Sequence, residues 1–269
     1  TDLSGRLSRL CGSPCLIIAA PMERDTVLAV HAAVSGRSGN LVVVLESSGG
    51  CPCCAYAIGR GLKRRFGRLV VFVPSMAKSA ATLIALAADE LVLGDLGELG
   101  PLDPQFSGRQ NADFPVGRSR LEVLRALELV REHALSTFDA AVRQVAENSG
   151  MRGEDVCRIG SELSARIYDP ILSQIDPLVL GETVRSLEVG AEYATRLLRR
   201  YRPEVWTRNG PRIVERLVHG YPDHGFSIDR EEMYELEIPV RAPDSDEAPI
   251  VEAMVSALRA GCPEETFVE

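Results

Sequence analysis

The chain has 269 residues, of which 45% are hydrophobic and 25% are charged. This length suits one large α/β domain, or a core domain with an appendage, and it buries enough apolar surface to fold without disulfides. The net charge of −8 disfavours binding along a phosphate backbone, so no nucleic-acid partner is expected.

The lengths of the hydrophobic runs and the number of cysteines indicate in which cellular compartment the protein is expected. No apolar run approaches the roughly 18 residues that indicate a membrane span, and the longest, at 15–20, lacks the flanks of a signal peptide. Seven cysteines, an odd number, indicate reduced thiols rather than a disulfide framework. The sequence therefore predicts a soluble, cytoplasmic protein without a membrane span; an anchor lying outside these residues would escape this prediction.

The first hundred residues alternate between short apolar runs and helical stretches. Strands are predicted at 15–20, 41–45, 69–73 and 91–93, with helices near 25–34, 55–66 and 79–88. Because the apolar runs are continuous, both faces of the sheet should be covered, and helices between strands predict right-handed crossovers and parallel pairing.

A Gly- and Pro-rich connection at 94–117 is followed by a mostly helical pattern. Helices are predicted from 119 to beyond 133 and near 154–163, 178–200, 212–218 and 229–236, with a short one near 248–260. The sequence thus predicts three parts: an α/β core over 1–117, a helical continuation packing on it over 118–240, and an acidic C-terminal tail over 241–269.

Two polar features follow predicted strands. Ser79 stands at a strand-to-helix turn among small residues, where amide groups of the helix start can stabilise the oxyanion of an acyl-transfer intermediate. The alternative is a simple N-cap serine. At the end of the preceding strand, Gly49 and Gly50 allow close backbone approach to a ligand, or form only a tight turn. Carboxyl ends of parallel strands share one edge, so both features should lie there.

These segments resemble a known superfamily. The sequence SSGG at 47–50 and AKSAATLIALAADE at 77–90 are similar to those of ClpP and signal peptide peptidase A. With LGPLDPQ at 99–105 and YPDHGF at 221–226, the chain resembles most the serine dehydrogenase (SDH) proteinase family, from about residue 15 to residue 240. The resemblance implies a ClpP/crotonase-like ββα superhelix, a polypeptide substrate and a homo-oligomer. Without an ATPase motif, energy-dependent unfolding would need a separate ATPase or activating partner.

The same resemblance implies site residues. Ser79 would be the nucleophile, the amide groups of Gly50 and Ala80 would form the oxyanion hole, and Lys78 and Gly49 would be accessory. Asp103 is the preferred orienting acid, although it also suits a plain turn in its Leu-Asp-Pro context. Two other acids remain open, Asp223 and Asp89.

The general base is the least certain role. No histidine lies about 25 residues after the serine, and no lysine follows Lys78. Lys78 adjoins the serine, and neighbouring side chains diverge, so it is expected to face the surface or a partner. His31 and His133 fall within predicted helices and are expected to be structural. His224 lies in a loop within the family-like stretch and is preferred as the base over His219.

Cysteines superficially suggest zinc, at Cys51, Cys53 and Cys54 with Cys11 and Cys15 upstream. The latter two precede one predicted strand and the others follow its neighbour, so they belong at opposite ends of a parallel pair, more than about 15 Å apart. No metal or other cofactor is therefore predicted. Cys53 and Cys54 are expected to pack at a helix start, and the role of Cys51 stays open between redox sensitivity and substrate contact.

The preferred interpretation is a serine peptidase that acts through an acyl-enzyme on Ser79. The main alternative is a catalytically degenerate, oligomeric scaffold of the same fold, because histidine and lysine are missing from the usual superfamily positions. A third is a crotonase-like acyl-CoA enzyme, whose fold also uses backbone oxyanion holes but no covalent serine chemistry.

Overall fold

A computed structural model describes residues 2–102, 120–151, 153–259 and 265–268. The chain forms two compact units: residues 1–104 together with 187–269, and residues 105–186. This division differs from the three consecutive parts expected, because residues after 241 belong to the same unit as the first hundred.

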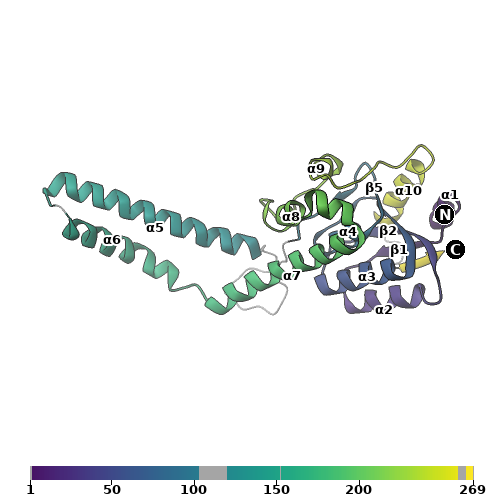
Figure 1. Ribbon diagram of the computed structural model, residues 1–269, viewed down its shortest axis with the longest axis horizontal. Coiled ribbons are helices and arrows are strands. Elements are labelled where there is room, and N and C mark those ends of the chain that lie inside the picture. The colour runs from purple at the N-terminus through teal and green to yellow at the C-terminus, as the bar shows by residue number, and fades with distance from the viewer. Residues whose placement is uncertain (1, 103–119, 152, 260–264, 269) are drawn as a thin grey trace. The chain divides into compact units, whose positions relative to one another are not determined.

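The first unit is built on a five-stranded sheet in the order β5-β3-β2-β1-β7 (Figure 1). Its strands are β1 (Cys15–Ala19), β2 (Gly39–Glu46), β3 (Phe66–Val73), β5 (Glu90–Leu93) and β7 (Glu265–Val268). The first four are parallel, in the register that pairs Cys15 with Val42 and Val70 with Glu90, and β7 is antiparallel to β1. The predicted α/β fold with a parallel sheet is confirmed.

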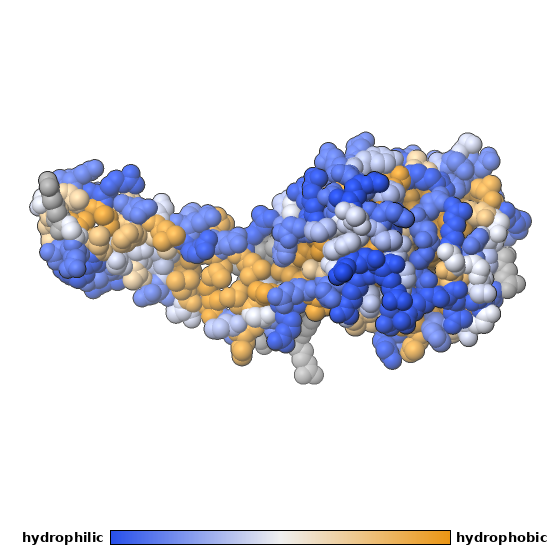
Figure 2. All heavy atoms as spheres, viewed as in Figure 1, coloured by the Kyte–Doolittle hydropathy of each residue, from blue (hydrophilic) through white to orange (hydrophobic). Residues whose placement is uncertain are grey.

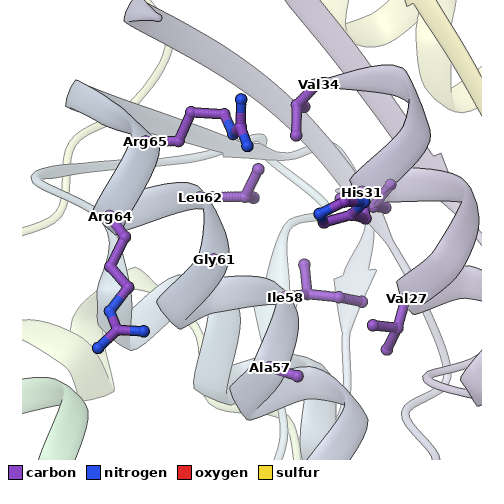
Figure 3. A pocket seen from close by; sticks show the side chains of 10 residues that line it. Val27, His31, Val34, Ala57, Ile58, Gly61, Leu62, Arg64 and Arg65 are labelled. Atoms are coloured by element: carbon purple, nitrogen blue, oxygen red, sulfur yellow. The ribbon is translucent and has the colours of Figure 1, made fainter. Parts of the chain in front are cut away.

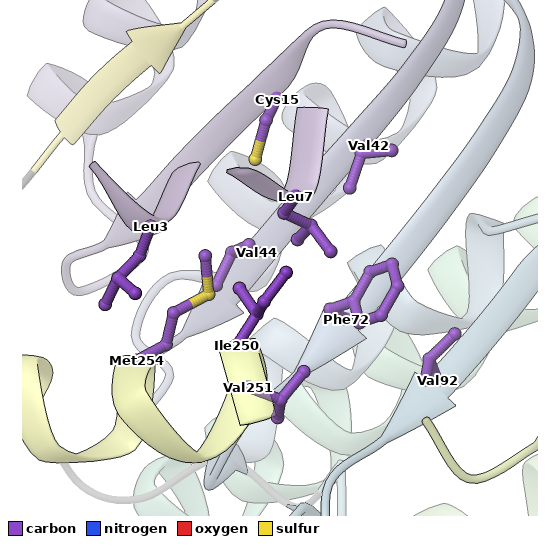
Figure 4. Packing of buried hydrophobic residues seen from close by; sticks show 10 residues of the cluster. All are labelled: Leu3, Leu7, Cys15, Val42, Val44, Phe72, Val92, Ile250, Val251 and Met254. Carbon is purple, nitrogen blue, oxygen red and sulfur yellow. The ribbon is translucent and has the colours of Figure 1, made fainter. Parts of the chain in front are cut away.

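Helices cover both faces of this sheet, as its continuous apolar strands require. On one face, α1 (Leu3–Cys11) and α10 (Ala248–Arg259) pack against side chains of four strands (Figure 4). On the other lie α2 (Arg24–Ala33) and α3 (Pro52–Arg65), and α4 (Thr82–Ala87) contacts α3 at Gly59 (Figure 1). The short strands β4 (Met76–Ala77) and β6 (Glu98–Leu99) pair beside the main sheet.

Three further helices follow in the later part of the chain. They are α7 (Pro177–Tyr201), whose last turns belong to the first unit, α8 (Pro203–His219) and α9 (Arg230–Glu235). Buried apolar side chains recur along α8 at Val205, Ile213, Val214, Leu217 and Val218. This helical spacing explains why α8 forms and which of its faces is buried.

The second unit contains α5 (Arg120–Ser149) and α6 (Glu154–Leu172), which lie antiparallel. The two helices approach closely at Gly160, where a Cβ atom would lie 2.7 Å from Val142 Cγ2. Gly150 and Gly153 take φ values of 67° and 73° in the turn between them. Antiparallel packing therefore depends on glycine at the turn and at the contact.

Large hydrophobic side chains remain exposed on the second unit along α6 and the start of α7 (Figure 2). They are Leu163, Ile167, Ile171, Leu172, Leu178 and Val184. An exposed apolar patch of this kind commonly marks a surface that binds another protein. No helix in the described part of the chain is both long enough and apolar enough to cross a membrane.

The C-terminal segment, residues 241–269, differs most from the acidic tail that its sequence predicts. Ile250, Val251 and Met254 of α10 lie in the hydrophobic core, each at most 4% exposed. Arg241 joins the segment to the sheet, since its backbone exchanges hydrogen bonds with Leu91 and Leu93 of β5. Asp244, Asp246 and Glu252 are exposed and Glu247 pairs with Arg241, while the apolar side chains of α10 complete one face of the sheet.

Candidate active site

Ser79 occupies a constrained position beyond the end of β3. The chain passes through β4 and enters a 3-10 turn, Ser79–Ala81, before α4 begins. Ser79 is 8% exposed and has a φ of 50°, a conformation that only one other non-glycine residue in the described ranges adopts, Glu237. Such backbone strain clusters at functional sites, where the surrounding structure holds the residue in place.

The glycine turn after β2 packs directly against this serine. Gly49 has a φ of 102°, and a Cβ atom there would lie 2.7 Å from Ser79 Cβ and 2.8 Å from the Lys78 carbonyl oxygen. The Ser47 hydroxyl accepts a hydrogen bond of 3.1 Å from the Gly49 amide and fixes the turn. The predicted proximity of the two features is thus present, and only glycine fits at position 49.

Backbone amide groups of Gly50 and Ala80 are the predicted oxyanion donors. Met22 hydrogen-bonds to the residues on either side of Gly50. Its amide donates to the Gly49 carbonyl oxygen, and its carbonyl oxygen accepts from the Cys51 amide, at 2.7 Å each. In a parallel bridge of this kind, the intervening residue directs its own N–H away from that partner. Ala80 lies in a first helical turn, where amides lack an intrahelical acceptor. Among the described residues, no backbone bond outside the helices and strands engages either amide, which makes both candidate donors to a ligand.

Lys78 is only partly exposed and is ion-paired, which corrects its expected position at the surface. Its side chain is 14% exposed, and Nζ lies 2.7 Å from the Glu98 carboxylate of β6. The ammonium group also donates to the carbonyl oxygens of Leu99 and Phe226, at 3.4 and 3.3 Å. Adjacent side chains diverge, so Lys78 turns toward these acceptors while Ser79 faces the glycine turn.

The loop that carries His224 reaches the same region. The rings of Tyr221 and Phe226 stack with their centroids 4.8 Å apart, and the Asp223 carboxylate accepts a hydrogen bond of 2.6 Å from the Gly225 amide. Ile228 exchanges two backbone hydrogen bonds with Leu99 of β6, the strand that also carries Glu98. Lys78 therefore links the nucleophile turn to the loop of half-buried His224.

The other candidate acids and bases lie elsewhere. The Asp89 carboxylate accepts hydrogen bonds from Lys63 Nζ at 2.5 Å and from the Leu69 amide at 2.7 Å. Asp89 lies at the start of β5, at the opposite end of the strands from Ser79. His219 ends α8, and Asp103 falls outside the described residues. His31 on α2 and His133 on α5 are exposed, and His133 belongs to the second unit.

Two side chains that support the site were not predicted from the sequence. The buried Thr82 hydroxyl contacts the carbonyl oxygens of Ala77 and Gly100, at 3.0 and 2.8 Å, and joins α4 to the residue after β6. The Glu46 carboxylate accepts the Ser75 and Met76 amides at 3.2 and 3.1 Å and holds the connection between β3 and β4. Gly100, the partner of Thr82, lies in the stretch 99–105, which the sequence marks only as a family motif. No local sequence pattern marks Glu46.

A separate hollow lies between α2 and α3 (Figure 3), with a volume of about 460 Å³. Valine, leucine and isoleucine side chains line it, with His31, Arg64 and Arg65 among them. Neither the Ser79 turn nor the glycine turn contributes a residue to its lining. The hollow is therefore not the place where a substrate of Ser79 would bind.

Residues 24–132 match the family of ClpP-like SDH-type serine proteinases. This stretch contains the glycine turn, Ser79, Lys78 and Glu98, and it is shorter than the resemblance inferred from sequence, which extended to about residue 240. The predicted resemblance to this family is confirmed for this part of the chain.

Two uncharacterized proteins of Methanocaldococcus jannaschii are similar over shorter stretches. One is 38% identical over 84 residues, 31% of this chain and 29% of the relative, and the other 29% identical over 108 residues, 39% and 35% of the two lengths. The matches thus span about a third of the length of these curated relatives.

Two solved structures are similar in fold. The 1510-N membrane-bound stomatin-specific protease, a mutant in complex with a substrate peptide, is 14% identical with a TM-score of 0.48, covering 86% of this chain and 75% of that one. ClpP1 from Listeria monocytogenes is 15% identical with a TM-score of 0.32, covering 55% and 78%.

Proposed function

We propose, from the family of residues 24–132 and the geometry around Ser79, that the protein is a serine peptidase. The observation that carries the proposal is the strained, largely buried Ser79 packed against the Gly49 turn. A serine that serves only as a helix N-cap needs neither a φ of 50° nor a facing glycine at contact distance.

The proposed reaction begins when Ser79 Oγ attacks the carbonyl carbon of a peptide bond. The hydroxyl proton passes to a general base, the carbonyl oxygen becomes an oxyanion, and the Gly50 and Ala80 amides donate to it. The C–N bond then breaks as the base returns the proton to the leaving amine. Water next attacks the acyl-enzyme by the same route, releases the acid and regenerates Ser79.

His224 is our proposed base, and Asp103 our proposed orienting acid. The loop of His224 is anchored by Lys78, the residue adjoining the nucleophile, and this anchoring is what favours His224 over His219 at the end of α8. Lys78 itself is a positioning residue in this scheme, because its ammonium group is engaged by Glu98 and by backbone carbonyls.

Labelling with a fluorophosphonate probe tests the proposal. We expect the wild type and the control Ser173→Ala, which removes an exposed serine after α6, to be labelled, and Ser79→Ala to be silent. In a folded His224→Gln variant the labelling rate should fall about 100-fold or more, the usual contribution of a general base. Equal labelling of Ser79→Ala and wild type would refute the nucleophile; unchanged labelling of His224→Gln would refute the base.

The scaffold alternative retains one supporting observation. No histidine or lysine stands at the usual superfamily position after Ser79, and the neighbouring Lys78 ammonium group is engaged by Glu98. We prefer the peptidase because Ser79 is strained and packs against the glycine turn. A folded wild type that resists the probe and cleaves no peptide would favour the scaffold.

Self-association is part of the proposal, with a polypeptide as substrate and a separate ATPase or activator as an optional partner. The exposed hydrophobic side chains along α6 and the start of α7 support a homo-oligomer, since burial between copies would remove them from water (Figure 2). Light scattering should give a mass several times 29.2 kDa. A stable monomer would refute this part and leave the peptidase proposal untouched.

A further inference from the structure

Three cysteine side chains meet at the beginning of α3, one residue beyond the glycine turn. Cys51 is the N-cap residue of the helix, and Cys53 and Cys54 lie in its first turn. All three sulfur atoms lie within 4.8 Å of one another, and the Cys51 and Cys53 sulfurs are 3.0 Å apart. The sequence predicts packing roles for Cys53 and Cys54, but both Cys51 and Cys53 are exposed and, of the three, only Cys54 is buried.

The spacing of these sulfurs is close to that of a thiolate metal site. Zinc binds sulfur at about 2.3 Å, so tetrahedral geometry places neighbouring sulfurs about 3.8 Å apart. Small rotations of exposed side chains would open the 3.0 Å pair to this distance while Cys54 stays packed. The backbone is already fixed, because the Cys51 amide binds the Met22 carbonyl oxygen at 2.7 Å and Pro52 restricts the next φ angle.

The first turn of α3 also suits anionic ligands. Amide groups there are directed out of the helix, and the helix dipole favours negative charge at this end. Thiolate, the form of cysteine that binds metal, carries such a negative charge.

We propose that Cys51, Cys53 and Cys54 bind one thiophilic divalent cation, for which Zn²⁺ is the probe. Soft thiolate ligands select ions of this class. Cys11 and Cys15 contribute nothing, since Cys15 begins β1 whereas Cys51 follows the far end of β2. No fourth histidine, cysteine or carboxylate joins the group among the residues described, so the protein supplies three ligands and water completes the site.

Ion binding would also act on the neighbouring turn. Cys51 directly follows Gly50, and its bond to Met22 helps to set the direction of the Gly50 amide. Drawing Cys51 toward a metal would shift this amide, and we therefore expect Zn²⁺ to slow the reaction of Ser79 with a fluorophosphonate. This second part rests on the proposed function, whereas metal binding does not.

The binding test uses the full chain, reduced with a phosphine and titrated with Zn²⁺ against a chromophoric chelator. We expect one ion per chain, weakened at least about tenfold by Cys51→Ser, Cys53→Ser or Cys54→Ala and unchanged by Cys157→Ser, an exposed cysteine of α6. Titration with Cd²⁺ should produce the ultraviolet thiolate-to-metal band in the wild type and the Cys157→Ser variant alone. Circular dichroism checks that each variant is folded.

The outcomes separate the possibilities. Failure of the reduced wild type to bind either ion, or equal affinity in all four variants, would overturn the metal site. A Cys51–Cys53 disulfide in the purified protein, with no binding after reduction, would assign the cluster to redox chemistry and also overturn it. Normal Zn²⁺ binding by a protein that never reacts with fluorophosphonate would refute the proposed hydrolase while leaving the metal site standing.

Discussion

Replacing Gly49 by alanine is the sharpest single perturbation of the site. A Cβ atom at this position would lie 2.7 Å from Ser79 Cβ, 2.8 Å from the Lys78 carbonyl oxygen and 3.3 Å from the Ala80 amide nitrogen. Two of these atoms are backbone, so the overlap cannot be relieved by rotating a flexible side chain. Relief requires the turn and the nucleophile to separate.

The cost has two components. A side chain at a φ of 102° costs about 1–3 kcal/mol in backbone strain, and the overlap adds about 1–3 kcal/mol, so Gly49→Ala should lower the free energy of unfolding by about 2–6 kcal/mol. Gly36→Ala is the matched control: its φ is 73°, but nothing lies within 4 Å of its Cβ position. The control should lose only about 1–2 kcal/mol.

Urea unfolding of the two variants measures this difference, and fluorophosphonate labelling of the folded fraction measures the effect on Ser79. We expect Gly49→Ala to be the less stable variant by at least about 1 kcal/mol and to label at least about tenfold more slowly. Gly36→Ala should label like the wild type. Equal stability of the two variants would mean that the turn and Ser79 are not in contact, and the proposed site would lose its main geometric support.

Three further predictions concern single side chains. Lys78→Met should cost about 1–3 kcal/mol in unfolding free energy and slow labelling, with partial rescue by Lys78→Arg, because it removes the ion pair and the anchor of the His224 loop; wild-type stability and labelling in Lys78→Met would contradict this. Thr82→Val should cost about 1–3 kcal/mol by urea unfolding, whereas Thr183→Val should be neutral or stabilising, because the buried Thr183 hydroxyl has no hydrogen-bond partner among described residues; the reverse order would refute the reasoning. Burial acts to raise the pKa of Glu90, but its arginine partners outweigh burial and lower that pKa. The stabilisation that Glu90 gives the folded protein is therefore present at neutral pH and lost as pH falls below about 4. The unfolding free energy of Glu90→Gln should thus fall less steeply with acid than that of the wild type, and identical pH profiles of the two proteins would contradict this prediction.

The sheet and the nucleophile turn were predictable because local signals and global structure agree there. Continuous apolar runs gave the four parallel strands with small errors at their ends, and the Gly49–Gly50 pair and Ser79 follow two of those strands. The helix predicted from Ser79 differs in one respect, since it begins with a 3-10 turn. The φ of 50° at Ser79 arises from packing against the glycine turn, which no single segment reveals.

Long-range pairings account for what the sequence did not indicate. Lys78 was expected at the surface because its partner, Glu98, lies twenty positions away on β6 and its other acceptors lie near Phe226. The same limit applies to the C-terminal segment. Its acidic composition suggested a solvated tail, but a strand-pairing partner, β1, lies at the opposite end of the sequence.

The placement of α10 and β7 has a consequence for synthesis of the chain. β1 is synthesised before β7, the strand that pairs with its outer edge and ends at Val268, and roughly 250 residues separate the two strands in the chain. At about 5–20 residues per second, that edge and the apolar face under α10 stay uncovered for about ten to fifty seconds. An unpaired strand edge is prone to aggregate. The outer edge of β1 is therefore exposed to other chains until β7 has been made and has paired with it.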